Sequence, residues 1–150
     1  MKRFIWIGLA VVILDHITKY LVTRNMTLHQ SIPVIPEVFH LTYVRNPGAA
    51  FGILPNQRLF FVLVTLVVLG VLIYFANQKG NSALLLTSFG LMLGGAVGNL
   101  IDRILWITVI DFFDFRFFPV FNIADSAIVI GVGLFALDML LDTRRNKGEA

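Results

Sequence analysis

The sequence contains no cysteine and few charged residues, and each shortage excludes a class of protein. Without cysteine there is no disulfide framework, no thiolate nucleophile and no thiolate metal site. Only 14% of the 150 residues are charged, whereas 57% are hydrophobic and the mean hydropathy is +0.83. A soluble domain of this length cannot bury so much apolar surface, so we expect lipid to surround most of it.

Basic residues slightly outnumber acidic ones, but their placement does not indicate nucleic-acid binding. The 12 lysines and arginines, against 9 acidic residues, give a formal net charge of +3. They are scattered or flank apolar stretches instead of clustering into a phosphate-binding patch. We therefore expect no nucleic-acid partner and interpret the basic residues as markers of membrane topology.

Four apolar stretches are each long enough to cross a bilayer as a helix, which takes about 20 residues. They cover about residues 4–22, 59–76, 83–105 and 123–141. A signal peptide is the alternative for the first stretch, but Asp15 and Lys19 interrupt it and no small-residue cleavage site follows, so we expect a retained helix. The sequence thus predicts a mainly α membrane protein, a four-helix transmembrane bundle in one domain of residues 1–150.

The basic residues also predict the orientation of these helices, because positive charge is enriched in cytoplasmic connections. They precede the first stretch, separate the second from the third and follow the fourth: Lys2, Arg3, Lys79, Arg144, Arg145 and Lys147. Both termini are therefore expected in the cytoplasm, and the connections of about residues 23–58 and 106–122 on the outer side. Arginines in these outer connections weaken the bias: Arg24, Arg45, Arg58 and Arg116.

The first outer connection carries a strand pattern. Residues 39–44 alternate in the period-two pattern of a half-buried strand, and Pro33, Pro36 and the segment 46–48 supply turns around it. We expect a small extracytoplasmic β-sheet within about residues 27–57, resting on the outer leaflet, with the glycine-broken apolar segment 49–54 along the membrane surface. The second outer connection is rich in phenylalanine and holds Trp106, which indicates interfacial anchoring.

Polar side chains inside the expected helices need an explanation, because a charged group there costs about 2.5–3.5 kcal/mol on insertion scales. Asp15 and Lys19 are one helical turn apart and can form an ion pair that either neutralises itself or serves a site. Another turn holds either an internal hydrogen-bonded cluster or functional groups: Asn99, Asp102 and Arg103. A glycine stripe is expected to serve helix packing: Gly90, Gly94 and Gly98.

Two further aspartates, Asp111 and Asp125, flank the last outer connection at about the same membrane depth. Taken singly, each is explained as a helix cap or an interfacial anion. As a pair in an apolar setting they would share a proton, so that one acts as a base toward water and the other as an acid toward a peptide carbonyl and its leaving amine. Such a pair predicts an aspartic protease that needs no cofactor.

Other protease chemistries lack their motifs in this sequence. The 3 histidines are not arranged as His-Glu-x-x-His, so no metal site is expected, and no serine lies in a Gly-x-Ser-x-Gly turn. The alternative function is a small proton-coupled transporter or channel, which would also place acids in a bundle but would spread polar residues across the membrane depth. A third alternative is a noncatalytic scaffold, for which the glycine stripe would suffice.

Five blocks in order along nearly the whole chain carry a family resemblance: residues 15–19 (DHITK), 46–51 (NPGAAF), 94–103 (GGAVGNLIDR), 109–112 (VIDF) and 121–125 (FNIAD). Together they resemble the lipoprotein signal peptidases, also called signal peptidase II. The resemblance implies an aspartic endopeptidase of the bacterial inner membrane that removes signal peptides from diacylglyceryl-modified prolipoproteins, cutting before the lipidated cysteine. It also implies contact with membrane lipid and inhibition by globomycin-type cyclic peptides.

By the same resemblance, Asp111 and Asp125 are the expected catalytic pair. The residues expected to bind substrate or shape its pocket are Asp15, Lys19, Asn46, Gly48, Asn99, Arg103 and Asn122. Lys19 is also expected to support Asp15. Asp102 is the rival partner for Asp125, but its polar turn favours a fixed anion over a proton shuttle, so we assign it a supporting role.

Overall fold

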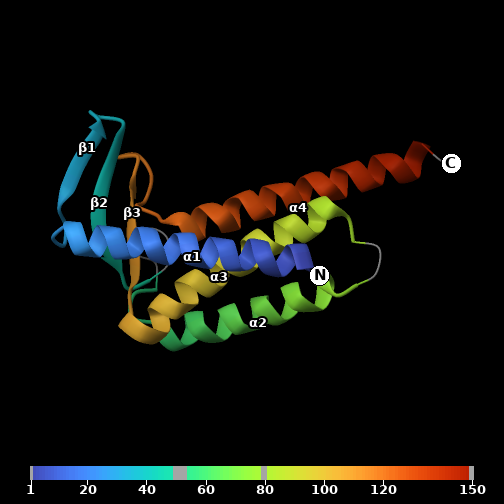
Figure 1. Cartoon of the computed structure of the whole chain (residues 1–150), viewed down its shortest axis with the longest axis horizontal. Coiled ribbons are helices and arrows are strands. Elements are labelled where there is room, and N and C mark those ends of the chain that lie inside the picture. The colour runs from blue at the N-terminus through green and yellow to red at the C-terminus, as the bar shows by residue number, and fades with distance from the viewer. Residues whose placement is uncertain (1, 49–53, 79–80, 149–150) are drawn as a thin grey trace.

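Four helices and three strands make up the fold that the computed structural model describes for residues 2–48, 54–78 and 81–148. Of residues 143–148 only the backbone is described. The helices are α1 (Lys2–Asn25), α2 (Arg58–Ala76), α3 (Ala83–Trp106) and α4 (Ile123–Gly148), and the strands are β1 (Ser31–Ile35), β2 (Phe39–Asn46) and β3 (Val109–Asp114). The helices form an elongated bundle with the sheet across one end (Figure 1).

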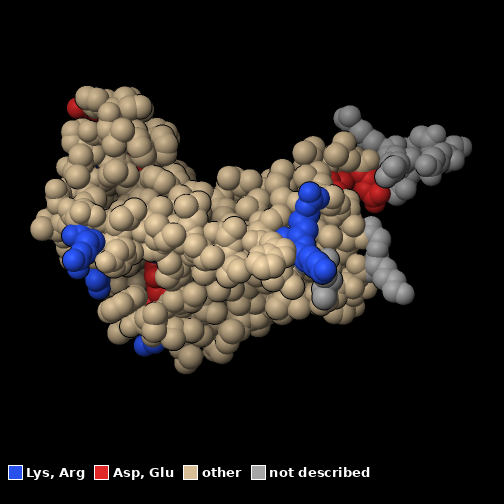
Figure 2. Space-filling model, in the orientation of Figure 1, with Lys and Arg blue, Asp and Glu red and all other residues tan. Residues whose placement is uncertain are grey.

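All four helices are long and apolar enough to cross a membrane, α4 over Ile123–Asp142. Their outward side chains are apolar although exposed: Leu59, Val67 and Val129 keep 71%, 67% and 70% of their surface. Such surfaces would favour aggregation in water, whereas hydrocarbon solvates them. Figure 2 shows charged side chains toward the two ends of the molecule, with a largely uncharged surface between them. The predicted bundle with a small sheet is therefore confirmed; α1, α2 and α3 lie within three residues of their predicted bounds, whereas α4 continues beyond its predicted end to Gly148.

Helix α1 begins, and helix α4 ends, at the end of the bundle opposite the sheet (Figure 1). This arrangement follows from four crossings of one membrane. Of the basic residues that predict a cytoplasmic location for this end, Lys2 and Arg3 are exposed at the start of α1, whereas Lys79 and the side chains of Arg144, Arg145 and Lys147 lie outside the described part of the chain. The cytoplasmic location of this end therefore stays a prediction.

The central helix is α3, which packs against the other three helices. Its glycine stripe lies against α1, as predicted, because a methyl group on Gly94 would stand only 2.6 Å from the carbonyl oxygen of Gly8. On the neighbouring face of α3, a methyl group on Gly95 would stand 2.3 Å from the carbonyl oxygen of Ala124 in α4. The missing side chains therefore let the backbones of α1 and α4 approach α3 closely at the same level.

The three strands form one antiparallel sheet in the order β1–β2–β3. β2 is the strand predicted from the alternating pattern, and β1 lies at the sheet edge, where Pro33 is tolerated. β3 was not predicted, because nearly all its side chains are buried and its sequence therefore shows no alternation. The segment predicted to lie along the membrane surface falls almost wholly outside the described residues.

Gly94→Ala is expected to lower the melting temperature of the detergent-solubilised protein, because the added methyl group meets backbone atoms of α1. Overpacking of this kind costs about 1–3 kcal/mol. Gly133→Ala in α4 is the matched control, since a methyl group there has nothing within 4 Å. Equal melting temperatures for the two variants would contradict the close approach of α1 and α3.

Candidate active site

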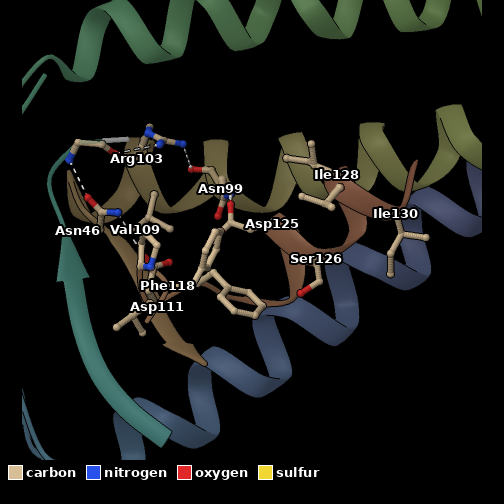
Figure 3. A pocket seen from close by; sticks show the side chains of 15 residues that line it. Asn46, Asn99, Arg103, Val109, Asp111, Phe118, Asp125, Ser126, Ile128 and Ile130 are labelled. Carbon is tan, nitrogen blue, oxygen red and sulfur yellow. Dashed lines mark hydrogen bonds between the residues drawn. The ribbon is translucent and has the colours of Figure 1, made fainter. Parts of the chain in front are cut away.

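A cavity of about 510 Å³ lies at the end of the bundle that carries the sheet, between β2, β3, α3, α4 and the loop that joins β3 to α4. Its polar wall (Figure 3) contains Asn46, Gly48, Asn99, Arg103, Asp111 and Asp125. Its apolar wall comes from the loop and from α4, with Phe118, Val120, Ile128 and Ile130 among its residues. The remaining predicted site residues are buried and are not part of the lining: Asp15, Lys19, Asp102 and Asn122.

Asp111 is held in the cavity wall by the attachment of β3 to the helices. The residue before it, Ile110, donates its N–H to Asp102 Oδ2 at 3.2 Å and accepts at its carbonyl oxygen from Asn122 Nδ2 at 3.2 Å. Asp102 of α3 and Asn122, which precedes α4, thereby satisfy the backbone N–H and carbonyl oxygen of Ile110. The Asp111 carboxyl is 2% exposed and accepts from Asn122 Nδ2 at 2.7 Å and from Asn46 Nδ2 at 3.0 Å.

Burial raises the pKa of Asp111 to about 7, and the negative charge of Asp125 adds to the effect. The hydrogen bonds from Asn46 and Asn122 and the charge of Lys19 act in the opposite direction but are outweighed. A carboxyl with this pKa exchanges its proton near neutral pH. Asp111 can therefore act as an acid where an ordinary aspartate is already ionised.

Asp125 occupies a different environment, in the first turn of α4. Asn122 Oδ1 accepts from the Asp125 N–H at 2.9 Å, and Asp125 Oδ2 accepts in return from the Asn122 N–H at 3.2 Å. This is a reciprocal capping arrangement of a helix N-terminus. The other oxygen, Oδ1, accepts from Asn99 Nδ2 at 2.7 Å. Both carboxylate oxygens of Asp125 thus accept hydrogen bonds, and the dipole of α4 also favours a negative charge at this N-terminus.

One buried residue, Asn122, contacts both carboxylates. Its side-chain Nδ2 donates to Asp111, its backbone N–H donates to Asp125, and its side chain is 0% exposed. The sequence-predicted pair is therefore brought together in one cavity wall, although Asp111 comes from a strand and Asp125 from a helix.

Behind the polar wall lies a buried charged cluster of Asp15, Lys19 and Asp102. The Lys19 ammonium lies 2.7 Å from Asp15 Oδ2 and 2.8 Å from Asp102 Oδ2, which confirms the ion pair predicted for Asp15 and Lys19. Asp15 Oδ1 accepts from the Ala124 N–H at 3.0 Å and so helps to cap α4. The cation that pairs with Asp102 comes from α1, a contact that the predicted polar turn did not include.

Arg103 lies on the cavity side of α3, with its guanidinium 4.9 Å from the ring centre of Phe61 in α2. It donates to the carbonyl oxygens of Asn99 and Gly48, each at 3.4 Å. The guanidinium thus links α2, α3 and the connection that follows β2. Its position beside the two aspartates provides positive charge at the cavity.

The apolar wall of the cavity and Ser126 beside Asp125 were not predicted from the sequence. The Ser126 hydroxyl donates to the carbonyl oxygen of Asn122 at 2.9 Å, so its hydrogen is engaged within α4. The phenylalanine-rich loop was a usable signal for Phe118, but it was interpreted as a membrane anchor. Ile128 and Ile130 gave no signal, because apolar residues occupy most of α4 whether they face lipid or the cavity.

The fold and the site together define a four-helix membrane protein with a carboxylate pair in one cavity wall, the groups that an aspartic protease requires. A family model described as "Signal peptidase (SPase) II" matches residues 7–141. The chain is 50% identical over 129 residues to a protein of Halothermothrix orenii named "Lipoprotein signal peptidase", covering 86% of this chain and 89% of that protein. It is 45% identical over 148 residues to the Bacillus subtilis protein of the same name, covering 95% and 96%.

A solved structure described as "Bacterial membrane enzyme structure by the in meso method at 2.3 A resolution" matches with a TM-score of 0.90 and 39% identity, covering 95% of this chain and 90% of that one. The chain therefore belongs to the signal peptidase II family. It is accordingly a membrane protease, and the transporter alternative finds no support in these similarities.

The raised pKa of Asp111 predicts that the folding stability falls as the pH rises, because the folded carboxyl holds a proton that the unfolded one has lost. The contribution is complete below the unfolded value of 3.8 and is lost once the pH passes about 7. Asp111→Asn removes this titration. Between about pH 5 and about pH 8, the melting temperature of the wild type should therefore fall by several degrees, roughly, relative to that of the variant. Parallel melting temperatures across this range would contradict a proton on Asp111.

Proposed function

We propose that this protein removes signal peptides from bacterial prolipoproteins, with Asp111 and Asp125 as its catalytic pair. The observation that carries the proposal is that both carboxylates line one cavity and accept hydrogen bonds from the same buried residue, Asn122. The name shared by the relatives supports the substrate class. A carboxylate pair can activate water for attack on a peptide bond without a covalent intermediate.

The different surroundings of the two carboxylates support a different role for each. Asp125 receives donors on both oxygens at a helix N-terminus, so we assign it as the ionised base. Asp111 has a pKa of about 7, so we assign it as the acid that carries the shared proton. Asp125 takes a proton from the attacking water while Asp111 gives its proton to the carbonyl oxygen. As the resulting diol collapses, Asp111 recovers a proton and Asp125 protonates the leaving amine.

The other predicted site residues divide by burial. We assign Asn46, Gly48 and Arg103 to substrate contact, because they line the cavity next to the carboxylate pair. For Asp15 and Lys19 burial favours a supporting role over substrate contact. Burial also favours a supporting role for Asp102, which bonds to the backbone of β3, and for Asn122, which donates to both carboxylates. Asn99 lines the cavity, and we assign it to hold Asp125 through a hydrogen bond.

The apolar wall supports a lipidated substrate. Val129 and Ile130 line the cavity and are also 70% and 55% exposed on the lipid-facing surface of α4, so the cavity is continuous with the hydrocarbon. A diacylglyceryl group could remain in the bilayer there while the adjacent peptide bond reaches the carboxylates. We propose that cleavage occurs before the lipidated cysteine and that globomycin-type cyclic peptides inhibit the enzyme by occupying this cavity.

The position of the cavity supports an active site at the outer face of the bacterial inner membrane. The cavity lies at the sheet end of the bundle, opposite the start of α1 and the end of α4 (Figure 1). The basic residues near the chain ends favour a cytoplasmic location for the termini. On this assignment the sheet and the cavity face the side on which exported proteins emerge.

Asp111→Asn and Asp125→Asn should each lower the turnover of a diacylated prolipoprotein peptide by about a thousandfold, because either change removes one partner in proton transfer. Asp114→Asn is the matched control in β3, since this carboxylate bonds to Thr42 and Arg116 and is not part of the cavity lining. The measurement is cleavage by the purified protein in lipid vesicles. Near-normal turnover by either of the first two variants would refute the catalytic pair.

Ile130→Gln should raise KM for a diacylated peptide by about tenfold, because it places an amide on the apolar wall where the acyl chains are expected to enter. KM for the same peptide without the lipid should be high already and should change little. Val132→Gln is the control, as an exposed residue of α4 outside the lining. Equal effects of the two variants would argue against lateral entry beside Ile130.

A further inference from the structure

Lys19 is not part of the cavity lining, yet it contacts the side chain that binds Asp125. Its ammonium group lies 2.7 Å from Asp15 Oδ2, 2.8 Å from Asp102 Oδ2 and 3.2 Å from Asn99 Oδ1. The ammonium therefore forms two ion pairs, with Asp15 and Asp102, and donates a hydrogen bond to Asn99. Two of the contacts neutralise buried carboxylates. The third goes to a neutral amide, which requires no counter-ion.

The side chain of Asn99 joins Lys19 to the proposed catalytic pair. Its Oδ1 accepts from Lys19 and also, at 3.1 Å, from Nδ2 of Asn122. Its Nδ2 donates to Asp125 Oδ1 at 2.7 Å, the shortest of these contacts. The amide therefore presents its acceptor to two donors and its donor to a carboxylate.

The opposite orientation of the Asn99 amide is disfavoured by Lys19. A half-turn of the amide would bring Nδ2 against the ammonium and against the amide of Asn122, where donor would face donor. It would also bring Oδ1 against the carboxylate of Asp125. Both contacts are repulsive, and the low dielectric of a buried site makes them more costly than in water. Because an ammonium can only donate hydrogen bonds, it favours the orientation of the Asn99 amide that presents Oδ1 to Lys19.

We infer that Lys19 is a positioning residue for catalysis, which acts through Asn99 to keep a hydrogen-bond donor on Asp125. The inference rests on the proposed function, because it concerns the base of the same carboxylate pair. Without the cation the Asn99 amide keeps only one of the two donors on its Oδ1, so the donor that holds the Asp125 carboxylate toward the attacking water is less firmly fixed. Because Lys19 touches no substrate, its loss lowers kcat and leaves KM unchanged.

Arg103, a cation whose charge interacts with Asp125, does not replace this contact. Its guanidinium donates to the backbone carbonyl oxygens of Asn99 and Gly48. It therefore adds positive charge beside the carboxylate pair without orienting the Asn99 side-chain amide. Among the described residues, Asn99 Oδ1 accepts from Lys19 and Asn122, so these two donors set the orientation of the amide.

Lys19→Met tests the inference, since methionine has a similar length but neither charge nor donor. It leaves Asp15 and Asp102 without a counter-ion, so a second variant combines Asp15→Asn with Lys19→Met and keeps the net charge of the cluster unchanged. An amide oxygen at position 15 can still accept from the Ala124 N–H, as Asp15 Oδ1 does. Lys2→Met, at the exposed start of the same helix, is the matched control.

Each full-length variant is reconstituted in lipid vesicles and assayed with a diacylated prolipoprotein peptide. We expect the double variant to fold and to lose about tenfold in kcat, the rate equivalent of one hydrogen bond, with KM within about twofold. In detergent, the ¹⁵N side-chain amide signal of Asn99 is assigned by its absence in Asn99→Asp. This signal should shift or split in the Lys19 variants and stay in place in Lys2→Met.

The outcomes separate the two proposals. If Asp111→Asn or Asp125→Asn retains turnover, the proposed catalytic pair fails, whatever Lys19 does. If those variants are inactive, an unchanged kcat and an unmoved Asn99 signal in the double variant overturn the positioning role. A rise in KM that accounts for the whole loss also overturns it, because Lys19 would then act on substrate binding. Failure of both Lys19 variants to fold would make the residue purely structural and would equally end the proposal.

Discussion

This structure depends on one constraint: each polar group at the sheet end of the bundle needs a partner within the protein. Between helices in hydrocarbon no water solvates a charge or an amide, so an unpaired group is costly. Lys19 binds two carboxylates, Asp15 caps α4 at Ala124, and Asp102 binds the backbone of β3 at Ile110. The contacts that satisfy these groups also fix where α4 and β3 begin, and those two starting points place the carboxylate pair.

The close approach of the helices is a condition for this cluster, because short side chains must reach from one helix to the next. A methyl group on Gly98 would stand 2.7 Å from Asp15 Oδ2, so only glycine leaves room for that carboxylate between α1 and α3. The glycine stripe therefore allows close helix packing and also leaves room for a buried carboxylate. Asp111 differs from the cluster, since its burial raises its pKa to about 7 and the fold tolerates a poorly solvated acid there. Such local cost is typical of functional sites.

The sequence reveals what lipid and helical spacing impose. Four spans follow from hydropathy, and the ion pair of Asp15 and Lys19 follows from a spacing of one turn. β3 could not be predicted, because a strand buried on both faces shows no alternation. The contact of Lys19 with Asp102 joins segments far apart in the chain, which no local pattern encodes. The apolar wall of the cavity could not be predicted for another reason. The face of α4 that lines the cavity at Ile128 is apolar, as is the face exposed to lipid, so the sequence does not distinguish them.

Helix α2 supports Arg103 but neither of the two carboxylates. It packs mainly against α3 and, among the described residues, gives none to the cavity lining. It meets the site through Phe61 under the Arg103 guanidinium and through Arg58, which donates to the Ile104 carbonyl oxygen at 2.7 Å near the end of α3. A displacement of α2 would therefore leave the Lys19 cluster and both carboxylates in place while altering the support of Arg103. The support of Arg103 thus depends on α2, whereas the positions of the two carboxylates are set by α1, α3, α4 and the sheet.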